Sequence, residues 1–186
     1  MTYPELYILR HGETVWNAEG RMQGWSNAPL TPAGEKQAVR QGEILRCQDL
    51  TGFRFYTSPL GRSVQTAAIA LSKLATEIHT DTRLREIGVG DWAGLLRRDL
   101  PMPSGSNSFM AQYEMAPNGE GFEKLKARCQ GFLDDLQGPA VLVTHGVTSA
   151  ILRGLVIGDA AYRDASPHAG QGAVYHVKDG KQALLD

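Results

Sequence analysis

The feature that most constrains this chain is a repeated change from a short apolar run, through a turn, into a helical pattern. The apolar runs cover residues 6–9, 52–56 and 140–144. Runs of this length predict strands that are buried on both faces, and strands that alternate with helices form a parallel sheet covered by helices. We therefore expect an α/β fold: a three-layer α/β/α sandwich with a mostly parallel central sheet.

Three further segments extend the expected sheet. A weaker strand is predicted at residues 76–79, the last strand at 173–177 and a short return strand at 182–185. The last two are joined by Asp179-Gly180, a dipeptide that is typical of a hairpin turn. Between residues 95 and 120 the regular pattern breaks down, so we expect a short variable cap insertion there, carried over the edge of the sheet and containing one helix.

The starts of two helices are marked by the sequence. Thr31-Pro32 predicts an N-cap followed by proline at the first helical position, opening a helix that runs to about residue 47. Ser58-Pro59 predicts the same arrangement for a helix that runs to about residue 74. Residues 123–136 carry apolar side chains at an amphipathic helical spacing.

Length, charge and cysteine content narrow the class of protein. A chain of 186 residues is expected to form one domain over its whole length, 1–186. The 19 Lys and Arg residues do not exceed the 20 Asp and Glu residues, which argues against a nucleic-acid partner. No apolar run approaches the roughly 18 residues of a membrane span. Cys47 and Cys129 suit neither a disulfide framework nor a zinc site. We expect both thiols to stay reduced and therefore expect a cytoplasmic protein. The sequence does not indicate an oligomeric state.

Basic residues follow the predicted strands where such sheets bind ligands. Arg10-His11 follows the first strand, and His145-Gly146 lies between the strand at 140–144 and a helix. Arg62 falls in the first turns of the helix predicted after Ser58. In parallel sheets the carboxyl ends of the strands share one edge, and a helix N-terminus there favours an anion. Two histidines and two arginines at this edge predict a pocket for a tetrahedral dianion such as phosphate.

Histidine in a phosphate pocket suggests covalent catalysis. A neutral imidazole can attack phosphorus and form a phosphohistidine, which divides one difficult displacement into two easier ones. The leaving group then needs a proton, and Glu86 is the candidate donor. We expect burial beside the negative charge of phosphate to favour the protonated form of this carboxyl.

Six blocks of sequence carry a resemblance to a known family. Residues 9–17 read Leu-Arg-His-Gly-Glu-Thr-Val-Trp-Asn, and further matching blocks lie at 21–25, 29–34, 58–67, 84–94 and 143–146. This ordered set resembles the histidine phosphatase superfamily (phosphoglycerate-mutase-like), branch 1. Arg-His-Gly alone would be a weak signal, but the blocks together span most of the chain.

The resemblance implies a role for each matching residue. His11 corresponds to the phosphorylated nucleophile and Glu86 to the proton donor, while His145 is a catalytic residue that also binds phosphate. The further phosphate ligands implied are Arg10, Asn17, Arg62 and the backbone N–H of Gly146. Arg21, Gln23 and Gly24 are candidate substrate-binding residues. Two positions depart from the family pattern: Asn27 stands where Asp is usual, and Gly121 where Ser is usual, which removes an expected N-cap.

The sequence therefore predicts a metal-independent hydrolase that acts on a small-molecule phosphate monoester through a phosphohistidine on His11, with no cofactor and no metal site. Arginines already supply the positive charge, and no cluster of carboxylates stands ready to hold magnesium. Two alternatives stay open. A phosphoglycerate-mutase-type phosphotransferase would need extra basic residues for a second anionic group, for which Arg21 or Arg83 could serve. A non-catalytic phosphate- or protein-binding relative would have no need of a positioned acid.

Overall fold

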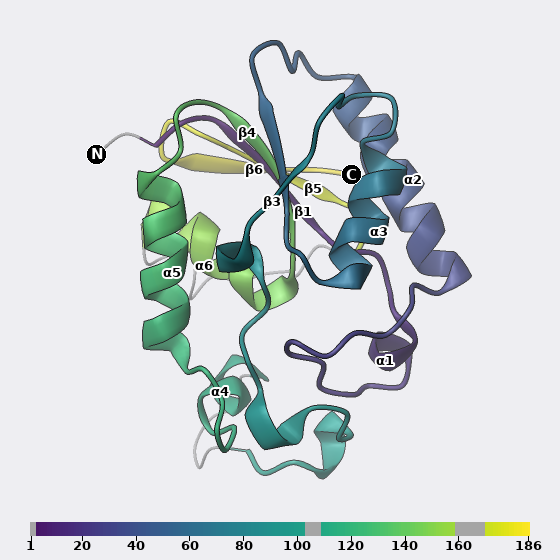
Figure 1. The fold of residues 1–186 in the computed structure, drawn as a ribbon, viewed down its shortest axis with the longest axis vertical. Coiled ribbons are helices and arrows are strands. Elements are labelled where there is room, and N and C mark those ends of the chain that lie inside the picture. Colours follow the sequence, from purple (N-terminus) through teal and green to yellow (C-terminus); the bar gives the residue numbers. More distant parts are fainter. Residues whose placement is uncertain (1–2, 103–108, 159–169) are drawn as a thin grey trace.

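A six-stranded sheet forms the centre of the protein (Figure 1). The computed structural model describes residues 3–102, 109–158 and 170–186. The strand order is β3-β2-β4-β1-β5-β6. Neighbours from β3 to β1 are parallel, whereas β5 and β6 form an antiparallel hairpin at one edge, so the predicted mostly parallel sheet is confirmed. The strands are β1 (Leu6–Arg10), β2 (Arg54–Thr57), β3 (His79–Thr80), β4 (Ala140–Thr144), β5 (Val174–Lys178) and β6 (Lys181–Leu185).

Helices cover both faces of this sheet, which gives the expected three layers. Figure 1 shows α2 (Pro32–Arg46) and α3 (Gly61–Ala70) on one side, and α5 (Phe122–Asp134) and α6 (Gly146–Ile157) on the other. The strand period of two divides β1 between the layers. Its Leu6 and Ile8 pack in the apolar cluster that includes α5 and α6, whereas Tyr7 and Leu9 pack in the cluster that includes α2 and α3.

The helix starts confirm one sequence prediction and overturn another. Thr31 is the N-cap of α2, and its hydroxyl oxygen accepts a hydrogen bond from the Gly34 N–H at 3.0 Å. The prediction that Ser58 caps the next helix is wrong, because α3 begins at Gly61 after a residue with no side-chain cap, and it ends at Ala70. The Ser58 hydroxyl instead lies 2.8 Å from a ring nitrogen of His145.

The expected insertion adds no strand to the sheet in the part of the chain that the structure describes. It contains a 3-10 turn (Arg97–Asp99) and α4 (Phe109–Glu114), and its residues 103–108 lie outside the described residues. In Figure 1, α4 and the short α1 (Val15–Ala18) both lie below the sheet. Gly121 precedes α5 without a side-chain cap, and the Glu114 carboxylate accepts the hydrogen bond of the Phe122 N–H at 2.8 Å. Within the described residues, no helix is long and apolar enough to cross a membrane.

Candidate active site

The ends of two neighbouring parallel strands bring the two predicted catalytic histidines together. Arg10 ends β1 and pairs in register with Thr144, which ends β4. The His11 N–H donates to the Thr144 carbonyl at 2.9 Å, which continues the strand pairing by one residue. The rings of His11 and His145 lie with their centroids 5.1 Å apart, so both side chains face the same small volume.

The hydrogen bonds of His11 define the tautomer of its ring. Nδ1 lies 2.7 Å from the Gly12 carbonyl oxygen, which can only accept, so Nδ1 carries the proton. Nε2 lies 3.2 Å from Nε of Arg62, which can only donate, so Nε2 carries a lone pair. His11 is thus neutral, with its unprotonated nitrogen turned toward an arginine.

Burial and nearby positive charge keep both imidazoles neutral. His11 is 3% exposed and His145 is fully buried. Burial lowers the pKa of His11 well below its usual 6.5, and the charges of Arg62 and Arg10 lower it further. The pKa of His145 is lowered for the same reasons, burial first and Arg62 next. A neutral imidazole is the form that a nucleophile requires.

Arg62 reaches the site from the first turn of α3 and is held there by backbone acceptors. Its Nη1 donates to the Ser26 carbonyl at 2.6 Å and its Nη2 to the Gly24 carbonyl at 2.8 Å. The side chain is 1% exposed, and burial lowers the pKa of its guanidinium to about 10, which leaves it charged at neutral pH. Asn27 accepts the Arg62 N–H at 2.9 Å through its Oδ1, so the amide at this position anchors the start of α3.

His145 has a partner that the sequence did not indicate. Its Nε2 lies 2.8 Å from the hydroxyl of Ser58. Its Nδ1 is buried and has no hydrogen-bond partner among the described residues. A buried polar atom without a partner costs free energy, so Nδ1 is a position at which a phosphate oxygen or its proton could be bound.

Glu86 lies against the first turn of α6. Its Oε1 accepts hydrogen bonds from the N–H groups of Ile87 and Thr148, at 3.0 and 3.1 Å, and from the Thr148 hydroxyl at 3.1 Å. Its Oε2 accepts from the Val147 N–H at 3.2 Å. In the described chain this is the one hydrogen bond of Oε2, so this oxygen is the one that can exchange a proton with a substrate.

The backbone of Glu86 is also held from outside, by two side chains that sequence reasoning did not single out for this role. Its carbonyl accepts from Nε1 of Trp25 at 2.8 Å and from Nη2 of Arg128 at 3.0 Å. Arg128 in turn forms an ion pair with Glu120, with 2.6 Å between Nε and Oε1. No sequence motif signals the contacts to the carbonyl, because Trp25 and Arg128 lie 61 and 42 positions from Glu86.

Arg10 and Gly146 lie in contact at the start of α6. A β-carbon at Gly146 would lie 3.4 Å from Cζ of Arg10, an ordinary van der Waals distance, so the guanidinium lies against the start of the helix. Nε of Arg10 is buried and has no hydrogen-bond partner within the described ranges. The Gly146 N–H is the first of the helix, where no acceptor within the helix is available. Both groups can donate to an anion.

The remaining candidate residues lie in three other places. Asn17 completes the capping box of α1: its Oδ1 accepts from the Thr14 N–H at 3.1 Å, and Gln23 donates to the Thr14 hydroxyl at 2.6 Å. Gly24 acts through its carbonyl on Arg62, as described above. Arg21 lies in an ion pair with Glu19 at 2.5 Å and is not brought to the histidines by any contact in the described residues.

Throughout the described ranges, no three His, Cys, Asp or Glu residues gather where they could hold a metal ion.

Comparison with known proteins identifies relatives that match most of the chain. Residues 6–183 match the family model of the histidine phosphatase superfamily (branch 1). A protein of Klebsiella pneumoniae (strain 342) named "Probable phosphoglycerate mutase GpmB" is 34% identical over 172 residues, which cover 86% of this chain and 78% of that protein.

Solved structures of similar proteins include phosphatases and mutases with the same overall fold. The alpha-ribazole phosphatase from Shigella flexneri is 26% identical, with a TM-score of 0.77 over 97% of this chain and 94% of that one. The phosphoglycerate mutase from Thermus thermophilus is 29% identical, with a TM-score of 0.73 over 98% of both chains. The chain therefore belongs to the histidine phosphatase superfamily, branch 1.

Proposed function

We propose that this protein hydrolyses a small-molecule phosphate monoester through a phosphohistidine on His11 and needs no metal ion. The observation that carries the proposal is the tautomer of the neutral His11 ring. Its Nδ1 proton is held by the Gly12 carbonyl at 2.7 Å, which leaves the lone pair on Nε2 in the cluster formed with Arg62 and His145. An imidazole with a defined tautomer in a cationic pocket suits in-line attack on phosphorus.

The reaction takes two displacements. In the first, Nε2 of His11 forms a bond to phosphorus while the bond to the leaving oxygen breaks, and Glu86 gives that oxygen a proton from Oε2. In the second, a water oxygen attacks phosphorus, the phosphorus–nitrogen bond breaks, and the Glu86 carboxylate takes a proton from the water. Phosphate leaves, and His11 and Glu86 return to their starting protonation states.

Positive charge and free donors stabilise the phosphoryl group in both steps. When the Nε2 lone pair of His11 forms the bond to phosphorus, the Nε–H of Arg62 donates to a phosphate oxygen instead of to His11. Arg10 Nε and His145 Nδ1, both buried without a partner among the described residues, are available for the other oxygens. Charge that is held in place before the reaction lowers the barrier because it needs no rearrangement during the step.

Hydrolysis is favoured over transfer between positions of one substrate by the ion pairs of Arg21 and Arg83, the two arginines that were candidates for a second anionic group. A mutase must bind a second anionic group. Arg21 is paired with Glu19, and Arg83 with Asp81 and Asp135, at distances of 2.5–2.8 Å. These arginines, which could have served a doubly charged substrate, are therefore already neutralised.

The test is hydrolysis of para-nitrophenyl phosphate in excess EDTA by the wild type, His11→Ala and, as a matched control, His79→Ala in the exposed strand β3. We expect activity to survive EDTA, to fall to background in His11→Ala and to persist in His79→Ala. Loss of activity with EDTA, or full activity of His11→Ala, would overturn the proposal. No activity in the wild type, combined with transfer of phosphate to phosphoglycerate, would favour the mutase.

A further inference from the structure

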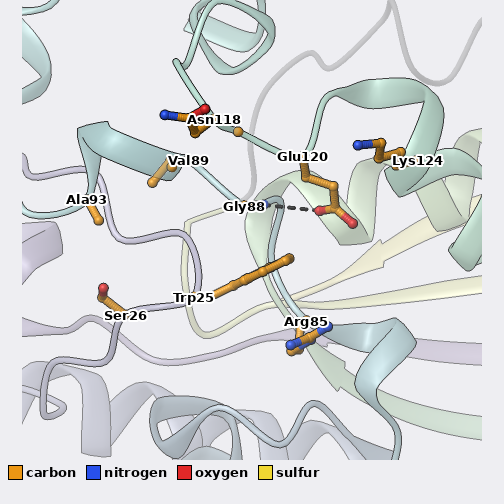
Figure 2. A pocket seen from close by; sticks show the side chains of 11 residues that line it. Trp25, Ser26, Arg85, Gly88, Val89, Ala93, Asn118, Glu120 and Lys124 are labelled. Atoms are coloured by element: carbon orange, nitrogen blue, oxygen red, sulfur yellow. Dashed lines mark hydrogen bonds between the residues drawn. The ribbon is translucent and has the colours of Figure 1, made fainter.

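A second pocket lies beside the candidate active site and shares none of its catalytic side chains. It has a volume of about 430 Å³, within the range of small-molecule sites. His11, Arg10, Arg62, His145 and Glu86 do not line it. Figure 2 shows its walls, which come from the loop with Trp25, the segment from Arg85 to Ala93, the turn with Asn118 and Glu120, and Lys124 at the start of α5.

A planar surface forms one wall of this pocket. Trp25 is 47% exposed, although its Nε1 is held by the Glu86 carbonyl. Cζ of Arg85 lies 4.4 Å from the centroid of the Trp25 ring, so the guanidinium and the indole are stacked. Figure 2 shows the indole edge-on between Gly88 and Arg85. Arg85 and Gly88 each cover part of the indole, and the part that stays exposed is a flat apolar surface against which a ligand ring can pack.

The charge that is left uncompensated in the pocket is positive. Arg85 donates through Nε to the Thr82 carbonyl at 3.1 Å, and in the described part of the chain neither of its Nη groups has an acceptor. Lys124 is exposed and forms no ion pair with any described residue. The Glu120 carboxylate is 7% exposed and is neutralised by Arg128 at 2.6 Å, with a further bond from the Gly88 N–H at 3.0 Å (Figure 2).

The backbone of residues 24–26 separates this pocket from the candidate phosphate site. The carbonyls of Gly24 and Ser26 both accept hydrogen bonds from Arg62, on the side of His11. The side chain of Trp25, which stands between them in the sequence, lines the pocket instead. A ligand in the pocket and a phosphate at His11 can therefore be bound at the same time.

We propose that this pocket binds an organic anion that carries a planar ring, at a site distinct from the phosphate site. The ring packs against the exposed part of Trp25, and the Nη groups of Arg85 and the ammonium of Lys124 attract the anionic group. These two cations supply the preference for an anion, and the exposed indole supplies the preference for a ring.

The probe for this site is 8-anilinonaphthalene-1-sulfonate, whose sulfonate cannot serve as a phosphoryl donor and whose fluorescence rises in an apolar site. We expect one saturable site in the wild type and loss of binding in Trp25→Ala. Lys124→Gln should weaken binding about two- to fivefold, because exposed charge pairs contribute roughly 0.4–1 kcal/mol. The matched control Lys126→Gln lies on the same helix, does not line the pocket and should bind like the wild type.

Two further measurements separate the site from the phosphate pocket and from nonspecific apolar binding. Inorganic phosphate should leave the probe bound, and the uncharged N-phenyl-1-naphthylamine should bind more weakly than the sulfonate. Displacement by phosphate, equal binding of the uncharged probe, or equal affinities of Lys124→Gln and Lys126→Gln would overturn the proposal. Because fluorescence involves no turnover, failure here would leave the hydrolytic function untouched.

Discussion

Lowering the pH should destabilise this protein through its two buried histidines. In the folded state the pKa values of His11 and His145 lie well below 6.5, whereas in the unfolded chain they return to about 6.5. The unfolded state therefore binds more protons below this pH. The stability that the neutral imidazoles contribute is fully present above pH 6.5 and is lost as the pH falls toward their folded pKa values.

The size of this loss in the free energy of unfolding follows from the number of protons that the unfolded chain binds in excess of the folded protein. Each histidine that is protonated only when unfolded changes the free energy of unfolding by about 1.4 kcal/mol per pH unit below its unfolded pKa. Two such histidines should lower the free energy of unfolding by ~3 kcal/mol between about pH 7.5 and 5.5. A loss of this size is a large share of the roughly 5–15 kcal/mol that is typical of a folded protein.

Urea denaturation at a series of pH values, in buffers without phosphate or sulfate, measures this change. His11→Gln and His145→Gln should each remove about half of the pH dependence in this window, and the double variant should remove nearly all of it. A wild-type stability that does not change between these pH values would refute the reasoning. So would single variants with the pH dependence of the wild type, since the titrating groups would then lie elsewhere.

Substitutions at four other positions test the packing and the chemistry. Gly34→Ala should cost about 2–3 kcal/mol in urea denaturation, because its β-carbon would lie 2.1 Å from the Glu13 carbonyl oxygen. Gly131→Ala, with no atom within 4 Å, should instead stabilise the protein by about 0.5–1 kcal/mol, and equal effects would contradict the packing. Ser58→Ala should cost about 1–3 kcal/mol because it removes a buried hydrogen bond, and an unchanged unfolding midpoint would argue against that bond. Glu86→Gln should lower kcat for an alkyl phosphate by about 10²-fold or more. The loss for para-nitrophenyl phosphate should be smaller, because that leaving group needs no proton. Equal losses for the two substrates would exclude Glu86 as the proton donor.

The parts of the site that follow from strand order could be predicted from the sequence. Arg10, His11 and His145 each come at or directly after the end of a buried parallel strand, and parallel strands end at one edge of a sheet. The sequence predicts Arg62 at the same edge, although its helix begins at Gly61, slightly later than the Ser58-Pro59 pattern indicates. A small error in a helix boundary does not move a side chain away from its end of the sheet.

The contacts that orient these side chains could not be predicted. Ser58 has the pattern of an N-cap, yet its hydroxyl bonds to His145, which lies 87 positions away. The sequence also does not indicate what orients Glu86, whose carboxylate accepts from N–H groups of α6 and whose backbone carbonyl accepts from Trp25 and Arg128. Local patterns report on neighbours in the sequence, whereas these hydrogen bonds depend on how distant segments pack.

The most direct test of this account is to locate the phosphoryl group on the enzyme during turnover. The protein is mixed with substrate, quenched in alkali, digested, and the phosphopeptide is examined by mass spectrometry and phosphorus NMR. The hydrogen bond from Nδ1 of His11 to the Gly12 carbonyl predicts an acid-labile phosphoryl group on Nε2 of His11. A phosphoryl group on Nδ1, on another residue such as Ser58, or on the His11→Ala variant would contradict it.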